Sequence, residues 1–435
     1  MLPQHKVTIF WFRRDLRLTD NHGLYQAMKK NNNVLPVFIF DKNILNKLDN
    51  KQDRRVAFIH ETLVALQQQL TGWNSSLLTI HDTPQQAFER IIEAYEVTAV
   101  FTNEDYEPYA LQRDDDLAKW FHQRGIEFHR FKDQVIFEKH EILKPDHTPY
   151  TVFTPYSKVW KSKLAMTKLE SYYIQALSDH FFQTPSLPFP TLTDLGFEEA
   201  SSGVAVATLN EELISNYHLR RNIPSIEGTT KLSVHLRFGT LSIRKLVALA
   251  LQWNEQWLNE LIWREFFMMI LFQFPHVVNN SFKRKYDAIP WRNDEETFAL
   301  WCAGKTGYPM VDAGMRELNE TGWMHNRVRM VVASFLTKHL LIDWRWGESY
   351  FSEKLLDFEL AVNNGNWQWA AGCGCDAAPY FRIFNPDEQV KKFDPEHLYL
   401  RRWLPEMARG NYTQPIIDHS FARDRALKVY KEAIA

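Results

Sequence analysis

The sequence lacks the marks of secreted and membrane-spanning proteins. It holds only three cysteines in 435 residues, an odd, small number that excludes a disulfide framework and fits a reducing compartment. It has no run of 18 apolar residues, because the nearest stretch, 261–278, is interrupted by Arg264, Glu265 and Gln273. The N-terminus also lacks the charged-then-apolar pattern of a signal peptide. We therefore expect a soluble, cytoplasmic protein with no membrane partner.

The sequence also has no excess of one charge sign. Its 51 Lys and Arg residues oppose 53 Asp and Glu residues, giving a net charge of −2, which argues against a polycation that coats nucleic acid. The hydrophobic content of 45% excludes disorder across the chain, since there is enough apolar surface to form cores. No segment repeats at a period of 20–50 residues, so a solenoid is not expected.

Two further absences limit the kinds of ligand site that the sequence is expected to form. The first predicted strand is followed by Arg-Arg-Asp-Leu-Arg at 13–17 and not by Gly-x-Gly-x-x-Gly, so the usual dinucleotide site is not expected. Cys373 and Cys375 have no second cysteine pair or spaced histidine pair nearby in the sequence. The simplest interpretation of these cysteines is a tight turn of small residues, and we expect no metal site.

The chain divides into three parts by pattern. Over residues 1–130, β-branched runs at 7–12, 34–40, 77–81 and 97–102 alternate with amphipathic stretches at 21–30, 54–70, 84–95 and 111–124. This alternation predicts an α/β domain with a parallel, Rossmann-like, doubly wound sheet. Residues 131–205 are interrupted by prolines and predict a connector. Residues 206–435, with long amphipathic stretches at 242–261, 311–321 and 328–341, predict an all-α domain.

Four stretches of the third part combine polar groups that could carry chemistry. Residues 227–233 offer hydroxyls, a glycine and Lys231 before a helical stretch, which suits either phosphate binding or helix capping. Glu260, Trp263 and Arg264 share one helix face, because they are spaced three and four residues apart. Asn326, Arg329 and Met330 share a face of another helix for the same reason. Residues 357–369 collect acids, amides and two of the fifteen tryptophans, a set that favours a site over simple core packing.

Together these stretches resemble the DNA photolyase/cryptochrome family. The resemblance runs from about residue 7 to about residue 410 and is carried by the motifs FWFRRDLRLTDN, EGTTKLSVHLRFGTLS, WLNELIWREFF, TGYPMVDAGMREL, WMHNRVRM and NNGNWQWAAGCGCDAAPYFRIFNP. It implies an N-terminal α/β domain that holds an antenna chromophore and a C-terminal helical domain that holds FAD bent into a U.

The resemblance also implies a role for individual residues. Those expected to hold FAD or line its cavity are Tyr217, Thr229, Thr230, Lys231, Leu232, Ser233, Trp257, Asn259, Glu260, Arg264, Asn326, Arg329, Asp357, Glu359 and Asn363. Among them, Arg329 and Asp357 would form an ion pair over the isoalloxazine, and Asn363 would lie beside flavin N5. Trp367, Trp344 and Trp291 match the family's electron-transfer chain, with Trp367 nearest the flavin; for each of them, core packing is the alternative.

Other positions indicate the subtype. Glu260, Trp263, Asn326, Met330 and Trp369 match class I cyclobutane pyrimidine dimer photolyases, in which two indole rings would wall the pocket and Glu260 would hydrogen-bond the dimer. Arg327 and Gln389 are further expected contacts to DNA. At the antenna region, Tyr109-Ala110 stands where folate-binding relatives often have Asn-Glu, so methenyltetrahydrofolate, a deazaflavin or no antenna all stay open.

The expected activity is therefore light-dependent DNA repair by a deoxyribodipyrimidine photo-lyase. Reduced FAD would donate an electron, on illumination, to a flipped-out pyrimidine dimer in UV-damaged DNA, and the electron would return after the dimer splits. We expect a monomer. The alternatives are a cryptochrome-type blue-light photosensor that signals through a partner, and a flavin redox enzyme that reuses the fold.

Overall fold

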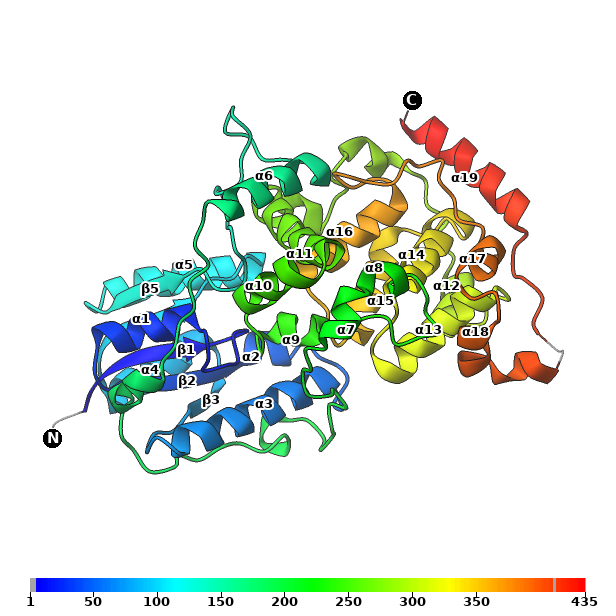
Figure 1. Ribbon diagram of the computed structural model, residues 1–435. Helices are drawn as coiled ribbons and strands as arrows, with labels where there is room; N and C mark the ends of the chain where they lie inside the picture. Colours follow the sequence, from blue (N-terminus) through cyan, green and yellow to red (C-terminus); the bar gives the residue numbers. More distant parts are fainter. Residues whose placement is uncertain (1–4, 410–411, 435) are drawn as a thin grey trace. The chain divides into compact units, whose positions relative to one another are not determined.

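Five parallel strands form one sheet in the N-terminal part of the chain, in the order β3-β2-β1-β4-β5 (Figure 1). The strands are β1 Lys6–Phe12, β2 Val34–Asp41, β3 Leu78–Asp82, β4 Glu96–Asn103 and β5 Glu127–Phe131. The first four confirm the predicted strands. The fifth was not predicted, because an edge strand with no fully buried residue lacks the continuous apolar run of a central parallel strand.

Helices cover both faces of this sheet, as expected for a doubly wound fold. The principal ones are α1 His22–Lys30, α3 Arg54–Thr71, α4 Pro84–Ala94 and α5 Pro108–His122, with the short α2 Lys42–Leu45 after β2. Phe88 of α4 and Phe121 of α5 share one core with Trp11 of β1. On the opposite face α1 approaches closely, since a Cβ on Gly23 would lie 3.0 Å from the Phe10 ring.

The chain's own side chains fill the crevice between β1 and β4, where the strand order reverses. This is the place where open α/β sheets usually bind ligands. Here Arg13 forms an ion pair with Asp114 at 2.6 Å, and Asn103 donates to Asp15 Oδ2 at 2.6 Å. Burial raises the pKa of the Asp15 carboxyl. The crevice thus has no glycine-rich loop, and paired polar side chains of the chain itself occupy it.

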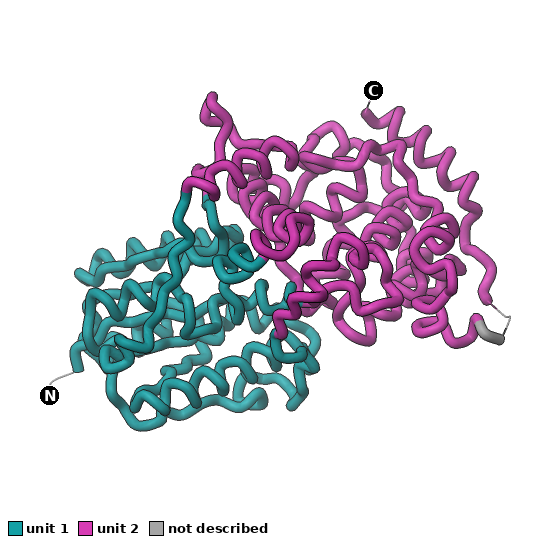
Figure 2. The backbone as a smooth tube through the Cα atoms, in the orientation of Figure 1, with its two compact units in different colours: residues 1–138, 167–207, 232–249 teal, residues 139–166, 208–231, 250–435 magenta. Residues whose placement is uncertain are grey.

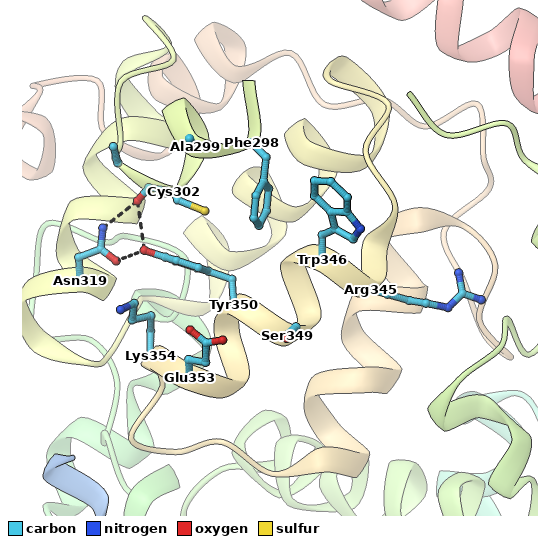
Figure 3. Close-up of a pocket in the computed structure, with 11 residues that line it drawn as sticks. Phe298, Ala299, Cys302, Asn319, Arg345, Trp346, Ser349, Tyr350, Glu353 and Lys354 are labelled. Atoms are coloured by element: carbon cyan, nitrogen blue, oxygen red, sulfur yellow. Dashed lines mark hydrogen bonds between the residues drawn. The ribbon is translucent and has the colours of Figure 1, made fainter. Parts of the chain in front are cut away.

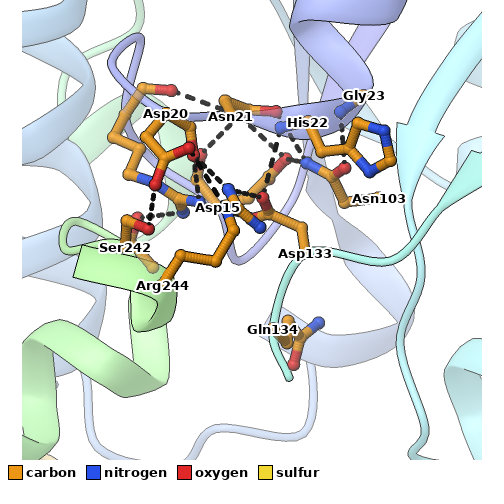
Figure 4. A network of polar contacts seen from close by, with 12 residues as sticks. Asp15, Asp20, Asn21, His22, Gly23, Asn103, Asp133, Gln134, Ser242 and Arg244 are labelled. Carbon is orange, nitrogen blue, oxygen red and sulfur yellow. Dashed lines mark hydrogen bonds and ion pairs between the residues drawn. The ribbon is translucent and has the colours of Figure 1, made fainter. Parts of the chain in front are cut away.

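A buried network of charged side chains ties a distant part of the sequence to this sheet (Figure 4). Asp133 accepts from Arg17 at 2.6 Å and from Arg244 at 2.8 Å, while Arg244 Nε also donates to Asp20 Oδ1 at 3.1 Å. Arg244 belongs to α10 Ile243–Trp253, which follows the short α9 Ser233–Phe238. These contacts explain why residues 232–249 belong to the same compact unit as the sheet.

The computed structural model describes residues 5–409 and 412–434 and divides into two compact units (Figure 2). The α/β unit comprises residues 1–138, 167–207 and 232–249, and the helical unit comprises 139–166, 208–231 and 250–435. These units differ from the predicted ranges 1–130, 131–205 and 206–435. The predicted connector is split between both units, because its contacts are made with residues far away in the sequence that local pattern does not reveal.

The helical unit is mostly α-helical, as predicted. Its α-helices are α6 Phe153–Ala165, α7 Glu211–Ser215, α8 Tyr217–Arg220, α11 Glu255–Gln273, α12 Glu295–Cys302, α13 Pro309–Thr321, α14 Asn326–Ser334, α15 Trp344–Lys354, α16 Leu360–Ala371, α17 Pro386–Phe393, α18 Leu398–Trp403 and α19 His419–Ile434. One core cluster contains the fully buried side chains of Trp301 and Trp344, together with Trp367. No helix within the described residues is long and apolar enough to cross a membrane.

Two predicted helices are interrupted. The stretch 242–261 breaks at Asn254, whose backbone is extended and whose side chain accepts a hydrogen bond from the Trp257 N–H, so it ends one helix and caps the next. The stretch 328–341 changes from α14 to a π-helical segment at Phe335–His339. Short 3₁₀ helices lie at Gln175–His180, Thr193–Leu195, Pro275–Val278, Arg284–Ala288 and Pro405–Arg409.

Candidate active site

A cavity of about 110 Å³ lies among α14, α15 and α16 of the helical unit. Eight residues that the sequence singled out line it: Asn326, Arg329, Met330, Asp357, Glu359, Asn363, Trp367 and Trp369. These side chains come from two separate stretches of the sequence, 326–330 and 357–369. The fold therefore gathers the predicted residues of these two stretches into one place, whereas most of the other predicted residues lie outside this cavity.

Apolar side chains complete the cavity wall, and sequence reasoning missed them. They are Ala333, Phe351, Leu355, Phe358, Val362 and Ala370. Nothing in their local pattern separates them from other core positions. Pockets that bind cofactors are usually lined by apolar side chains together with a few polar groups.

Two ion pairs provide the charge at this cavity. The Arg329 guanidinium contacts Asp357 at 2.9 Å and donates from Nε to the Met324 carbonyl at 2.8 Å. Arg264 of α11 contacts Glu359 at 2.9 Å, and both side chains are largely buried. A buried ion pair stabilises a fold little by itself, so two pairs at one cavity favour a binding role.

Asn363 of α16 is held in one orientation by Glu348 of α15. Its amide nitrogen donates to Glu348 Oε1 at 2.8 Å and to the Glu348 carbonyl at 3.1 Å. Burial raises the pKa of the Glu348 carboxyl. Because both amide hydrogens are used, the group that Asn363 can offer a ligand is its carbonyl oxygen, an acceptor. Glu348 was not predicted as part of the site.

Trp367 lines the cavity and is almost fully buried between α15 and α16. A Cβ on Gly347 would lie 2.1 Å from Trp367 Cη2, so only glycine allows α15 to approach this ring. Trp344 stands one turn before Gly347 on α15 and is fully buried in the same core cluster, against which Trp291 packs as a half-buried residue. Trp301 contacts Trp367 edge-on, with ring centroids 6.2 Å apart, although it was not predicted.

Apart from Arg264, which contacts Glu359, the predicted residues of α11 have partners elsewhere and do not line the cavity. Glu260 forms an ion pair with Arg221 and accepts from Gln256 at 3.0 Å. Trp263 stacks in parallel on Phe153, with ring centroids 3.7 Å apart. Trp257 is buried in the core and Asn259 is half-buried.

The predicted phosphate-binding stretch crosses the boundary between the units. Tyr217, Thr229, Thr230 and Lys231 belong to the helical unit, whereas Leu232 and Ser233 belong to the α/β unit, where α9 begins at Ser233. Burial raises the pKa of the Tyr217 phenol. Lys231 has a left-handed backbone at φ 51° and contacts Glu227 at 3.0 Å.

Two predicted DNA contacts lie outside the cavity. Arg327 is half-buried: it donates to Asn222 at 2.7 Å, and its guanidinium covers the Phe393 ring at 4.4 Å. It is therefore less open to solvent than the sequence suggested. Gln389 lies on α17, and its Oε1 has no hydrogen-bond partner among the described residues.

A larger hollow of about 860 Å³ opens elsewhere on the helical unit (Figure 3). Its wall includes Phe298, Trp346 and Tyr350, and the Tyr350 hydroxyl donates to Asn319 Oδ1 at 2.6 Å. None of the predicted site residues lines it. The smaller cavity is the better candidate because charged and amide side chains converge on it.

Comparison with known proteins decides the family. The family model for the FAD binding domain of DNA photolyase matches residues 257–411, and the DNA photolyase model matches residues 8–174. The chain belongs to the DNA photolyase family. The match to the FAD-binding model lies wholly in the helical unit and includes the residues that form the cavity, whereas the match to the DNA photolyase model includes residues of both units.

Individual photolyases align with nearly the whole chain. A deoxyribodipyrimidine photo-lyase from Synechococcus is 36% identical, over 98% of this chain and 96% of its own. A class III photolyase structure from Agrobacterium tumefaciens has a TM-score of 0.86 at 30% identity and covers 100% of this chain and 98% of its own. An archaeal photolyase structure from Sulfolobus tokodaii, described with two FAD molecules, has a TM-score of 0.81 at 32% identity and covers 98% of this chain and 100% of its own. The predicted family and enzyme class, a photo-lyase that uses FAD, are confirmed.

The residues of the cavity fit a flavin. The fixed Asn363 amide presents an acceptor, Arg329 and Asp357 present a donor and an acceptor side by side, and the apolar wall suits a flat ring. Trp367 adds an oxidisable indole at the same wall. The predicted ion pair between Arg329 and Asp357 forms, but the individual roles of these residues remain proposals.

Proposed function

We propose that this protein repairs cyclobutane pyrimidine dimers in UV-damaged DNA in a light-dependent reaction, with reduced FAD as its cofactor. One observation carries the proposal: the same cavity gathers Asn363, Arg329 and Trp367, expected at the flavin, and Met330 and Trp369, expected at the dimer. A cofactor and a substrate that exchange an electron must lie close together, and a shared cavity provides that proximity.

The residues of the helical unit that would hold FAD are of two kinds. Hydroxyl and ammonium groups of Thr229, Thr230 and Lys231 would bind the phosphates. Arg264, Arg329, Asp357, Glu359 and Asn363 would hold the ring system and its polar edge. When bound in its reduced form, FAD supplies an electron on absorbing near-UV or blue light.

Within this set, Asn363 and the tryptophans have distinct tasks. The Asn363 carbonyl oxygen would accept a hydrogen bond from a protonated ring nitrogen of the flavin, since Glu348 holds the amide nitrogen on the other side. The Trp367, Trp344 and Trp291 side chains would act as electron donors to oxidised FAD, with Trp367, which lines the cavity, as the first of them. A series of close, oxidisable rings provides short steps in place of one long one.

On the substrate side, Trp263 and Trp369 would wall the pocket with flat rings that stack on a base turned out of the helix. Glu260 would hydrogen-bond the dimer carbonyls, and Asn326 and Met330 would complete the contact. Arg327, and Gln389 on α17, would contact the DNA strand and set its register. This pattern corresponds to the class I enzymes.

The test is direct. Purified, photoreduced protein should clear cyclobutane thymine dimers from an oligonucleotide under blue light and not in the dark. If reducible FAD is bound and the dimers persist, the repair function is wrong, and a photosensor role takes its place. The absorption spectrum of the same sample shows the flavin redox state and any antenna band, which identifies a folate, a deazaflavin or no antenna.

A further inference from the structure

Trp263, the expected substrate-side ring of α11, owes its orientation to a residue from another part of the chain. Phe153, the first residue of α6, stacks on it with ring centroids 3.7 Å apart and planes inclined by 5°. The other ring contacts of Trp263 in the described structure are with Phe266 and Phe267, one turn further along its own helix. Of these three rings, Phe153 alone comes from outside α11, and because it lies parallel to the indole it constrains the tilt of the indole relative to α11.

Phe153 is itself held firmly. Its backbone N–H, one of the donors that a helix start leaves without an intrahelical partner, donates to Asp376 Oδ2 at 2.9 Å. The preceding Val152 makes no side-chain cap, so the Asp376 carboxylate takes that role and opposes the helix dipole favourably. Asp376 lies in the loop after α16, the helix that carries Asn363, Trp367 and Trp369.

A second contact fixes α6 two turns later. Trp160 Nε1 donates to Glu265 Oε1 at 2.5 Å, and residues seven apart lie on one face of a helix. Phe153 and Trp160 therefore attach the same face of α6 to α11, at Trp263 and at Glu265. One loop thus couples α16, which carries the flavin-side residues, through α6 to the substrate-side ring.

We propose that Phe153 is a positioning residue for damage recognition: it covers one face of Trp263 and holds the ring ready to stack on a pyrimidine dimer with the other. This inference rests on the proposed function. A ring already held in its binding orientation loses less conformational freedom when the substrate binds, so preorganisation appears as tighter and more selective binding. Phe153 acts through Trp263 and does not touch the reacting atoms.

The experiment measures binding in the dark, where no turnover occurs. FAD-loaded protein is titrated with a duplex that carries one cyclobutane thymine dimer and with the undamaged duplex, and the ratio of the two dissociation constants gives the selectivity. Phe153→Leu should lower the selectivity about fivefold, as expected for loss of an aromatic stack, and Phe153→Tyr should restore it. Phe272→Leu, another half-buried aromatic change on α11, should leave it unchanged.

Flavin content and the thermal midpoint, measured for each variant, separate effects on folding from effects on selectivity. If Phe153→Leu does not fold, Asp376→Ala, which keeps the ring and removes its anchor, should lower selectivity about twofold. Unchanged selectivity in the folded variants would overturn the inference, and so would tighter dimer binding, since Phe153 would then cover the binding face. A wild-type protein without preference for the dimer would overturn the proposed function itself.

Discussion

Replacing Gly347 by alanine should destabilise the helical unit. The sign of the change in stability tests how closely α15 packs against Trp367. In an open helix interior, alanine is about 1 kcal/mol more favourable than glycine. At Gly347, however, the new Cβ would lie 2.1 Å from Trp367 Cη2 and 2.6 Å from Leu336 Cδ2. Carbon atoms in contact are about 3.5–4.0 Å apart, so the indole or the helix must move by more than 1 Å.

The indole has little room to move. Phe351 and Trp301 contact the Trp367 ring edge-on, with centroids 5.0 Å and 6.2 Å away. Overpacking of a filled core costs about 1–3 kcal/mol. Because Trp367 is confined on several sides, we expect a cost near the upper end of that range and a net loss of about 2 kcal/mol after the gain in helix propensity.

Urea unfolding followed by flavin fluorescence measures this loss as a lower midpoint with an unchanged slope. Ser349→Ala is the matched control, because Ser349 is exposed on the same helix and should change stability by less than about 0.5 kcal/mol. A Gly347→Ala protein as stable as the wild type, or more so, would refute the close packing of α15 against Trp367.

Three further predictions concern the site and its surroundings. Trp367→Phe should slow photoreduction of oxidised FAD but leave repair by pre-reduced enzyme largely intact; equal loss of both in the two assays would mean that Trp367 is misassigned. Glu260→Ala should lower the repair yield at unchanged flavin content, because its partner Arg221 is partly exposed and tolerates the loss; a flavin-free product would make Glu260 structural. Burial lowers the pKa of His325 to about 4, so only the unfolded chain binds its proton between about pH 4 and 6.5, and stability falls as pH drops through that window. At pH 5 the resulting loss in the free energy of unfolding is about 2 kcal/mol. The variant His325→Asn can still cap α14 and should make the urea midpoint depend less on pH. If the pH dependence of the midpoint is unchanged in this variant, His325 is not its source.

Part of the fold could be predicted because its signals are local. Strands β1 and β2 are buried along nearly their whole length and appear as continuous apolar runs in the sequence. Strand β5 has no such run, because it lies at the sheet edge. The break at Asn254 depends on its side chain, which caps the next helix. The amphipathic pattern continues through this residue, so the pattern alone does not reveal the break.

Which residues share the candidate cavity could be predicted only in part, for the same reason. The cavity residues on α14 and α16 belong to recognisable motifs, and the structure brings them together. Their partners could not be found in this way. Glu348 contacts Asn363 from another helix, and Phe153 reaches Trp263 from what looked like a connector, so both contacts exist only through tertiary packing.

The charged network around Asp133 determines when the α/β unit can form during synthesis. Asp20 and Asp133 are made early, but Arg244 follows more than a hundred residues later. A nascent chain that has not yet exposed α10 would have to bury these carboxylates with one partner missing, which costs about 3–5 kcal/mol for such a pair. The sheet therefore reaches full stability only after residues up to 249 have left the ribosome, by which time residues 139–166 of the helical unit have also emerged.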